Sequence, residues 1–145
     1  MAHVNVKALA ALASMLVGDD VSVKIVTGGD AYGMATHDRT QPVICLRADL
    51  ADDPELLRLT FYHEVAHHIH GHIPALGARP ETVGGQLGEL LGLMVRRQVD
   101  RELASVGAIV DVETQADDGA LALAPVVERF LLSAYNKTFF DIAII

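Results

Sequence analysis

The feature that most constrains this chain is the pentapeptide His63-Glu64-Val65-Ala66-His67, an H-E-x-x-H motif within a predicted helix. Asp53 can cap the first free backbone N–H groups of that helix, and Pro54 suits its first position. Gly71 predicts that the helix ends near His70. Side chains four residues apart leave the same face of a helix, about 6 Å apart along its axis. Both imidazoles can therefore reach one metal ion.

The residue types in the motif predict a catalytic zinc site. His63 and His67 are the predicted ligands, because two imidazoles one turn apart suit tetrahedral zinc. Glu64 lies about 100° further round the helix. From there it can exchange protons with a water molecule beside the metal, as a catalytic residue. Two other interpretations stay open: a histidine-rich surface helix without metal, and a zinc site that only stabilises the fold.

Three further histidines follow the motif. His68 is predicted to be exposed, His70 can share the face of His63, and His72 can help to shape the mouth of the site. We expect these three to be solvated or supporting side chains, because a fourth protein ligand would close a catalytic zinc to water.

The third protein ligand has to come from elsewhere in the chain. A long helix is predicted after Pro80, with an apolar stripe made of Val83, Leu87, Leu91, Val95, Val99 and Val106. Glu102 falls on this stripe, where an unpaired buried carboxylate would be costly unless a cation compensates it. Glu102 is the preferred ligand, and Glu89, Asp100 or some other group remain alternatives.

Composition limits the classes of function. The chain has 145 residues, which predicts a single domain over residues 1–145, and a net charge of -8, which disfavours direct nucleic-acid binding. Cys45 is the single cysteine, so a disulfide framework and a cysteine-based zinc cluster are excluded. The longest apolar run is Ala8–Val17, too short to span a membrane and better interpreted as a first helix than as a signal peptide. We therefore expect a soluble, cytoplasmic protein.

The remaining pattern predicts an α+β fold. Three strands are expected at Val21–Thr27, Ala31–His37 and Pro42–Arg47, joined as a meander by short turns. The apolar side of the motif helix is expected to include Leu59 and Tyr62. Asp117 and Asp118 precede a last predicted helix at roughly Pro125–Asn136. The apolar tail, Phe139–Ile145, is expected to pack on the core rather than on a partner.

The segment His63–His72, HEVAHHIHGH, resembles the signature of the ImmA/IrrE family of small zinc metallopeptidases. That family takes its third ligand from a downstream helix with a pattern like E-x-E-A-x-x-F-A-A-x-L, to which Asp100–Val110 is similar if Glu102 is the ligand. The zincin-like domain of plasmid antirestriction proteins is a weaker match. The resemblance implies a small zincin-like domain and a cytoplasmic, site-specific endopeptidase that often cuts a helix-turn-helix repressor.

The expected activity is therefore zinc-dependent cleavage of an intracellular regulatory protein. The substrate is expected to lie extended along a sheet edge, for which Pro42–Arg47 is the chosen strand. Tyr135 is a candidate for stabilising the oxyanion, whereas Tyr62 is expected to pack in the core. The alternative is a non-catalytic zinc protein that holds a repressor, toxin or other partner. The oligomeric state stays open.

Overall fold

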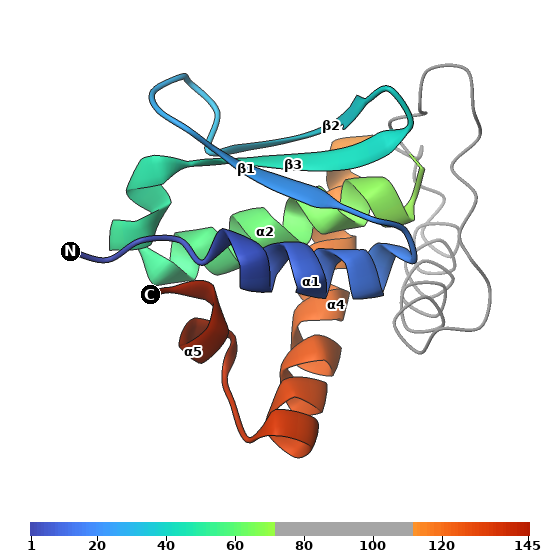
Figure 1. Ribbon diagram of the computed structural model, residues 1–145. Coiled ribbons are helices and arrows are strands. Elements are labelled where there is room, and N and C mark those ends of the chain that lie inside the picture. The colour runs from blue at the N-terminus through green and yellow to red at the C-terminus, as the bar shows by residue number, and fades with distance from the viewer. Residues whose placement is uncertain (72–111) are drawn as a thin grey trace.

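The computed structural model describes residues 1–71 and 112–145 (Figure 1). The described elements, in chain order, are α1 (Val6–Val17), β1 (Ser22–Val26), β2 (Gly33–Asp38), β3 (Gln41–Arg47), a 3-10 turn η1 (Ala48–Asp52), α2 (Pro54–Ile69), α4 (Val112–Tyr135) and α5 (Phe139–Ala143). The small three-stranded sheet with helices confirms the predicted α+β class. Among the described helices, none is both long and apolar enough to cross a membrane.

The three predicted strands are present, but their order is not that of a meander. The sheet has the order β1-β3-β2, with β1 parallel to β3 and β2 antiparallel to β3. The β3 strand takes the central position because it is the most apolar of the three, with Pro42, Val43, Ile44 and Leu46 buried. Pro42–Arg47 is therefore not a sheet edge, which corrects the prediction for substrate binding. Within residues 1–71 and 112–145, the edge strands of this sheet are β1 and β2.

The predicted first helix is confirmed as α1. Its N-terminus is capped by the Asn5 side chain, and Gly18 ends it in the left-handed region, with φ of 79°. Leu9, Leu12 and Leu16 are buried at helical spacing. In Figure 1, α1 and α2 lie side by side beneath the sheet, so they cover one of its faces.

Helix α2 begins as predicted, with the Asp53 carboxylate accepting a hydrogen bond from the N–H of Leu56. It lies between the sheet and α4, so both of its sides are covered. His68 is therefore buried, not exposed as expected, and its Nε2 donates to the carbonyl oxygen of Val43 at 3.0 Å. Leu59, expected on the apolar side, is 42% exposed instead.

Helix α4 begins at Val112, well before the predicted start at Pro125. The buried residues of α4 form one continuous stripe at spacings of three and four residues, and this stripe outweighs the backbone hydrogen bond that Pro125 cannot donate. Asp117 and Asp118 thus lie within the helix and not before it. Arg58 of α2 and Glu128 of α4 form an ion pair at 2.7 Å that joins the two helices.

Gly119 allows α4 to approach α2 closely. A Cβ atom at this position would lie 3.0 Å from the Cβ of Ala66 and 3.2 Å from Nε2 of His70. Both distances are shorter than an ordinary van der Waals contact, so the absence of a side chain lets the helices pack at this separation.

The apolar tail packs on the core, as expected. Its residues form α5, whose capping box joins Thr138 and Asp141, and Phe139 is buried against the rings of Phe61 and Tyr62. The two ends of the chain pair in a short bridge between Val4 and Ile144 (Figure 1).

Candidate metal centre

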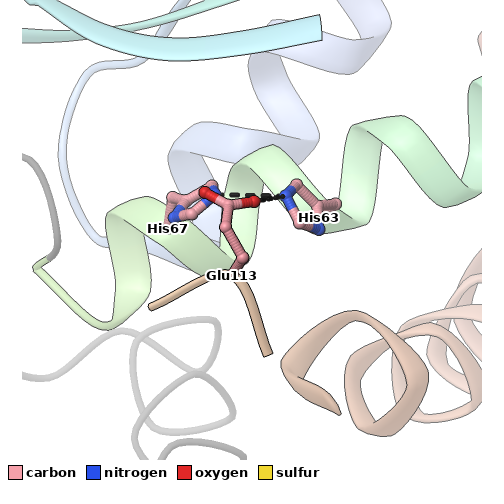
Figure 2. A group of neighbouring side chains, drawn as sticks. All are labelled: His63, His67 and Glu113. Atoms are coloured by element: carbon pink, nitrogen blue, oxygen red, sulfur yellow. Dashed lines mark hydrogen bonds and ion pairs between the residues drawn. The ribbon is translucent and has the colours of Figure 1, made fainter. Parts of the chain in front are cut away.

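Helix α2 brings two imidazoles of the motif together, as the four-residue spacing predicts. The Nε2 atoms of His63 and His67 are 3.1 Å apart, and the rings lie nearly perpendicular to each other (Figure 2). Two nitrogens at this distance can share at most one proton between them, or they can both face one cation.

Glu113, in the first turn of α4, places its carboxylate against both rings. Its Oε2 lies 3.1 Å from Nε2 of His63, and its Oε1 lies 3.3 Å from Nε2 of His67. Ligand atoms of the three side chains all lie within 4.8 Å of one another. Donors around a tetrahedral metal at about 2.0–2.1 Å are about 3.3 Å apart. His63, His67 and Glu113 therefore form a group that could hold a metal ion.

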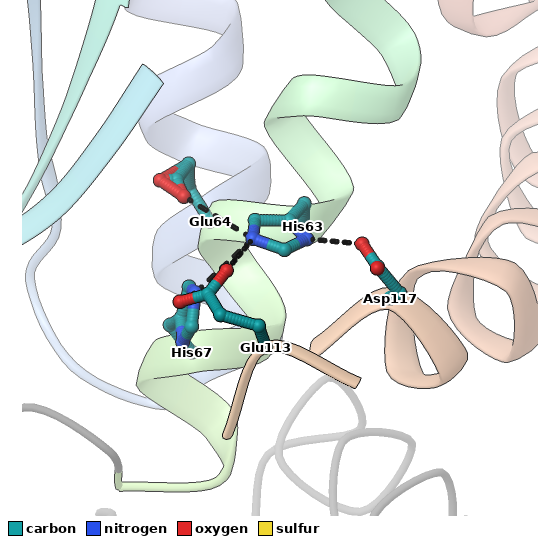
Figure 3. Close-up of polar contacts among 5 residues, drawn as sticks. All are labelled: His63, Glu64, His67, Glu113 and Asp117. Carbon is teal, nitrogen blue, oxygen red and sulfur yellow. Dashed lines mark hydrogen bonds and ion pairs between the residues drawn. The ribbon is translucent and has the colours of Figure 1, made fainter. Parts of the chain in front are cut away.

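Asp117 orients one of these rings. Its Oδ1 accepts a hydrogen bond from Nδ1 of His63 at 2.8 Å (Figure 3). A neutral His63 that donates from Nδ1 directs its Nε2 lone pair at Glu113 and His67. The lone pair of His63 Nε2 then faces the Glu113 carboxylate, an arrangement that a divalent cation stabilises. Carboxylate–histidine pairs of this kind are typical of metal sites.

Glu64 lies beside this group but points away from Glu113 (Figure 3). Its Oε1 is 3.8 Å from Nε2 of His63, and the residue is only 5% exposed. Burial raises the pKa of Glu64 to about 7. The nearby His63 opposes this shift, and the Glu113 carboxylate adds to it. The Oε2 atom of Glu64 has no hydrogen-bond partner within the described ranges.

The group opens on a cavity of about 520 Å³ between β2, α2 and the start of α4. Its lining consists of Tyr32, Gly33, Met34, Ala35, Leu59, Thr60, His63, Glu64, His67, Val112, Glu113 and Asp117. An edge strand therefore borders the same space that the two histidines, Glu64 and Glu113 face. This arrangement can hold a metal, a proton acceptor and an extended chain together.

The predicted site residues have different outcomes. His63, Glu64 and His67 come together as expected. Glu102, Glu89 and Asp100 lie outside the described residues, as do His72 and the predicted helix after Pro80, so the choice of Glu102 stays a prediction.

The remaining candidates lie away from the pocket. Tyr62 is fully buried in the core, as expected. Tyr135 lies near the end of α4 and lines a different cavity, between α1, α4 and α5. His70 is buried close to Gly119.

Two of the site residues, Glu113 and Asp117, were not among the sequence candidates. They are four residues apart, which places both on one face of α4, so their spacing was a usable signal. The pattern E-x-E-A-x-x-F-A-A-x-L matches only in part from Glu113 onward. Glu113, Ala116, Ala120 and Leu123 match its first, fourth, eighth and last positions, whereas Gln115, Gly119 and Leu121 depart from it. Glu113 falls at the first position of the pattern, whereas Glu102 falls at the third.

A scan against protein-family models, a search of curated proteins and a search of solved structures each found no match to this chain.

Proposed function

We propose that this chain is a zinc-dependent endopeptidase, which cleaves an intracellular regulatory protein such as a repressor. The observation that carries the proposal is the position of Glu64. A site that only stabilised a fold would need the ligands alone, yet a buried carboxylate lies beside the histidine pair and lines the same pocket.

His63, His67 and Glu113 are the proposed zinc ligands. Two imidazoles and one carboxylate with room for a further ligand is the donor set of many hydrolytic zinc sites. When bound, zinc would lower the pKa of a water molecule and polarise a substrate carbonyl. Asp117 would keep His63 in the tautomer that offers Nε2, and Glu102 remains the competing third ligand.

Glu64 is the proposed proton carrier. It is buried beside the proposed ligands, where a carboxylate can accept a proton from water and return it. It would take a proton from a water molecule in the pocket and pass it to the leaving amine. The Oε1 atom of Glu64 lies 3.8 Å from Nε2 of His63, so Glu64 is adjacent to the proposed ligands.

The substrate would bind along β2. Among the described strands, β2 pairs with β3 alone, so its other edge would offer backbone N–H and C=O groups to an extended chain. Gly33 and Ala35 line the pocket together with Glu64, so a chain bound along that edge would pass close to Glu64.

The test is cleavage by the zinc-loaded Glu64→Gln variant. Wild type and variant are incubated with a peptide library prepared from a bacterial proteome, and new N-termini are identified by mass spectrometry. Glu64→Gln should bind zinc as wild type does and lose at least about a hundredfold in cleavage rate. Glu55→Gln, an exposed change on the same helix, should keep full activity.

Full cleavage by Glu64→Gln would contradict the proposed mechanism. If wild type binds zinc but cleaves no peptide of the library, the result would favour the alternative, a zinc-containing protein that holds a partner without cutting it.

A further inference from the structure

The walls of the pocket carry exposed apolar side chains on both sides of the ligand group. Leu59 lies one helical turn before His63 on α2, and Val112 directly precedes Glu113 on α4. They are 42% and 46% exposed, respectively, and both line the cavity. Apolar side chains on the walls of a cavity form a surface against which an apolar group of a ligand can pack.

The β2 side of the pocket is lined largely by small residues. A Cβ on Gly33 would lie 2.6 Å from Cγ2 of Thr60 and 3.2 Å from Cγ of Glu64, so β2 approaches α2 with almost no side chain between them. Ala35, two residues on, faces the same way and is buried. If an extended substrate paired with β2 as an added strand, its side chains on the pocket side would therefore point toward α2 and α4. Leu59 and Val112 lie on these two helices.

Tyr32 adds an aromatic wall to the pocket, and Arg47 contacts it. The guanidinium of Arg47 lies 4.3 Å from the centre of the Tyr32 ring. The Arg47 backbone N–H donates to the Tyr32 carbonyl at 2.8 Å, and its side chain donates to the Gly29 carbonyl and to Asp49. Because these contacts fix the loop before β2, Tyr32 can contact a ligand at a small cost in conformational entropy.

The charged groups that line the pocket are acidic. Glu64, Glu113 and Asp117 line it, and its described lining contains no Lys or Arg that could pair with an acidic substrate. A polar side chain held against Leu59 and Val112 would also lose its hydrogen bonds to water.

We propose that the pocket selects an extended substrate that carries a large apolar side chain next to the bond to be cut. Leu59, Val112 and Tyr32 are the specificity-determining residues, and Arg47 is a positioning residue for Tyr32. This inference rests on the proposed zinc peptidase function.

Binding of two small hydroxamates tests the inference without requiring turnover. N-acetyl-leucine hydroxamate and N-acetyl-asparagine hydroxamate share the same zinc-binding group and have side chains of similar shape, so they differ mainly in polarity. Their affinities for the zinc-loaded protein are measured by isothermal titration calorimetry. The leucine compound should bind at least about tenfold more tightly.

A pair of variants assigns that preference to the pocket wall. Leu59→Asn should reduce the affinity ratio to near one. Leu132→Asn changes an exposed leucine on α4 that does not line the pocket, and it should leave the ratio unchanged. Equal binding of both compounds to wild type would overturn the inference and leave the proposed function standing. Binding of neither compound would overturn both.

Discussion

At the scale of single residues, the site depends on how His63 is held. The Nδ1 atom of His63 donates to Asp117 at 2.8 Å, which fixes the tautomer that offers Nε2 to a metal. Asp117 is thus expected to influence the candidate metal site through His63, one of its proposed ligands.

Asp117→Asn tests this role. An amide is a weaker acceptor than a carboxylate and can also present an N–H to the ring, so the required tautomer loses support. We expect zinc affinity to fall by about 10–100-fold, measured by competition with a fluorescent chelator. The neighbouring change Asp118→Asn should leave the affinity within about twofold of wild type. Equal affinities in the two variants would contradict the assigned role of Asp117.

The sequence allowed part of the site to be predicted at this scale. The spacing of His63 and His67 places two imidazoles on one helical face, whatever surrounds that helix. The third position could not be found in the same way. Glu102 was preferred because it falls on an apolar stripe, whereas Glu113 has a 64% exposed side chain and offers no such burial signal. Its proximity to the histidines depends on how two helices pack.

At the scale of the elements, that packing depends on Gly119. Any side chain here meets the Cβ of Ala66 and the ring of His70, and the Cβ of Ala66 can move only if the α2 backbone moves. The start of α4, with Glu113 and Asp117, would be displaced together with the helix.

Gly119→Val should therefore destabilise the fold and weaken the metal site together. We expect a loss of about 1–3 kcal/mol in the free energy of unfolding, measured by urea titration, and weaker zinc binding. In an open helical position the same change would not destabilise, because valine is a better helix former than glycine.

Ser133→Val is the matched control, since Ser133 is exposed on the same helix. Its effect on the free energy of unfolding should stay within about 0.5 kcal/mol. If Gly119→Val proved as stable as wild type, the close approach of α4 to α2 would be wrong.

The elements themselves were predicted better than their arrangement. The three strands and the start of α2 follow from local patterns, such as the Asp53 cap and the β-branched run before Thr27. The strand order β1-β3-β2 does not follow from local patterns, because a meander and this sheet have the same succession of strands along the chain. The early start of α4 was missed because Pro125 marks a helix start locally, and only burial of a stripe from Gln115 to Leu131 overrides it.

At the scale of the whole molecule, α2 is the central element. The sheet and α1 cover one side of it and α4 covers the other. This explains why His68 and His70 are buried, although the sequence of this segment is rich in histidine and polar residues. The ligand face of α2 remains open between β2 and the first turn of α4. The fold therefore brings an edge strand, a proton acceptor and three candidate ligands from two separated stretches of the chain to one cavity.

The measurement that tests the central claim most directly is zinc content and affinity in wild type, Glu113→Ala and Glu102→Ala. Elemental mass spectrometry gives the zinc content of the dialysed proteins, and chelator competition gives the affinity. The account predicts one zinc per wild-type chain, a loss of at least about a hundredfold in affinity for Glu113→Ala, and near wild-type affinity for Glu102→Ala. Unchanged affinity in Glu113→Ala, with loss in Glu102→Ala, would contradict it.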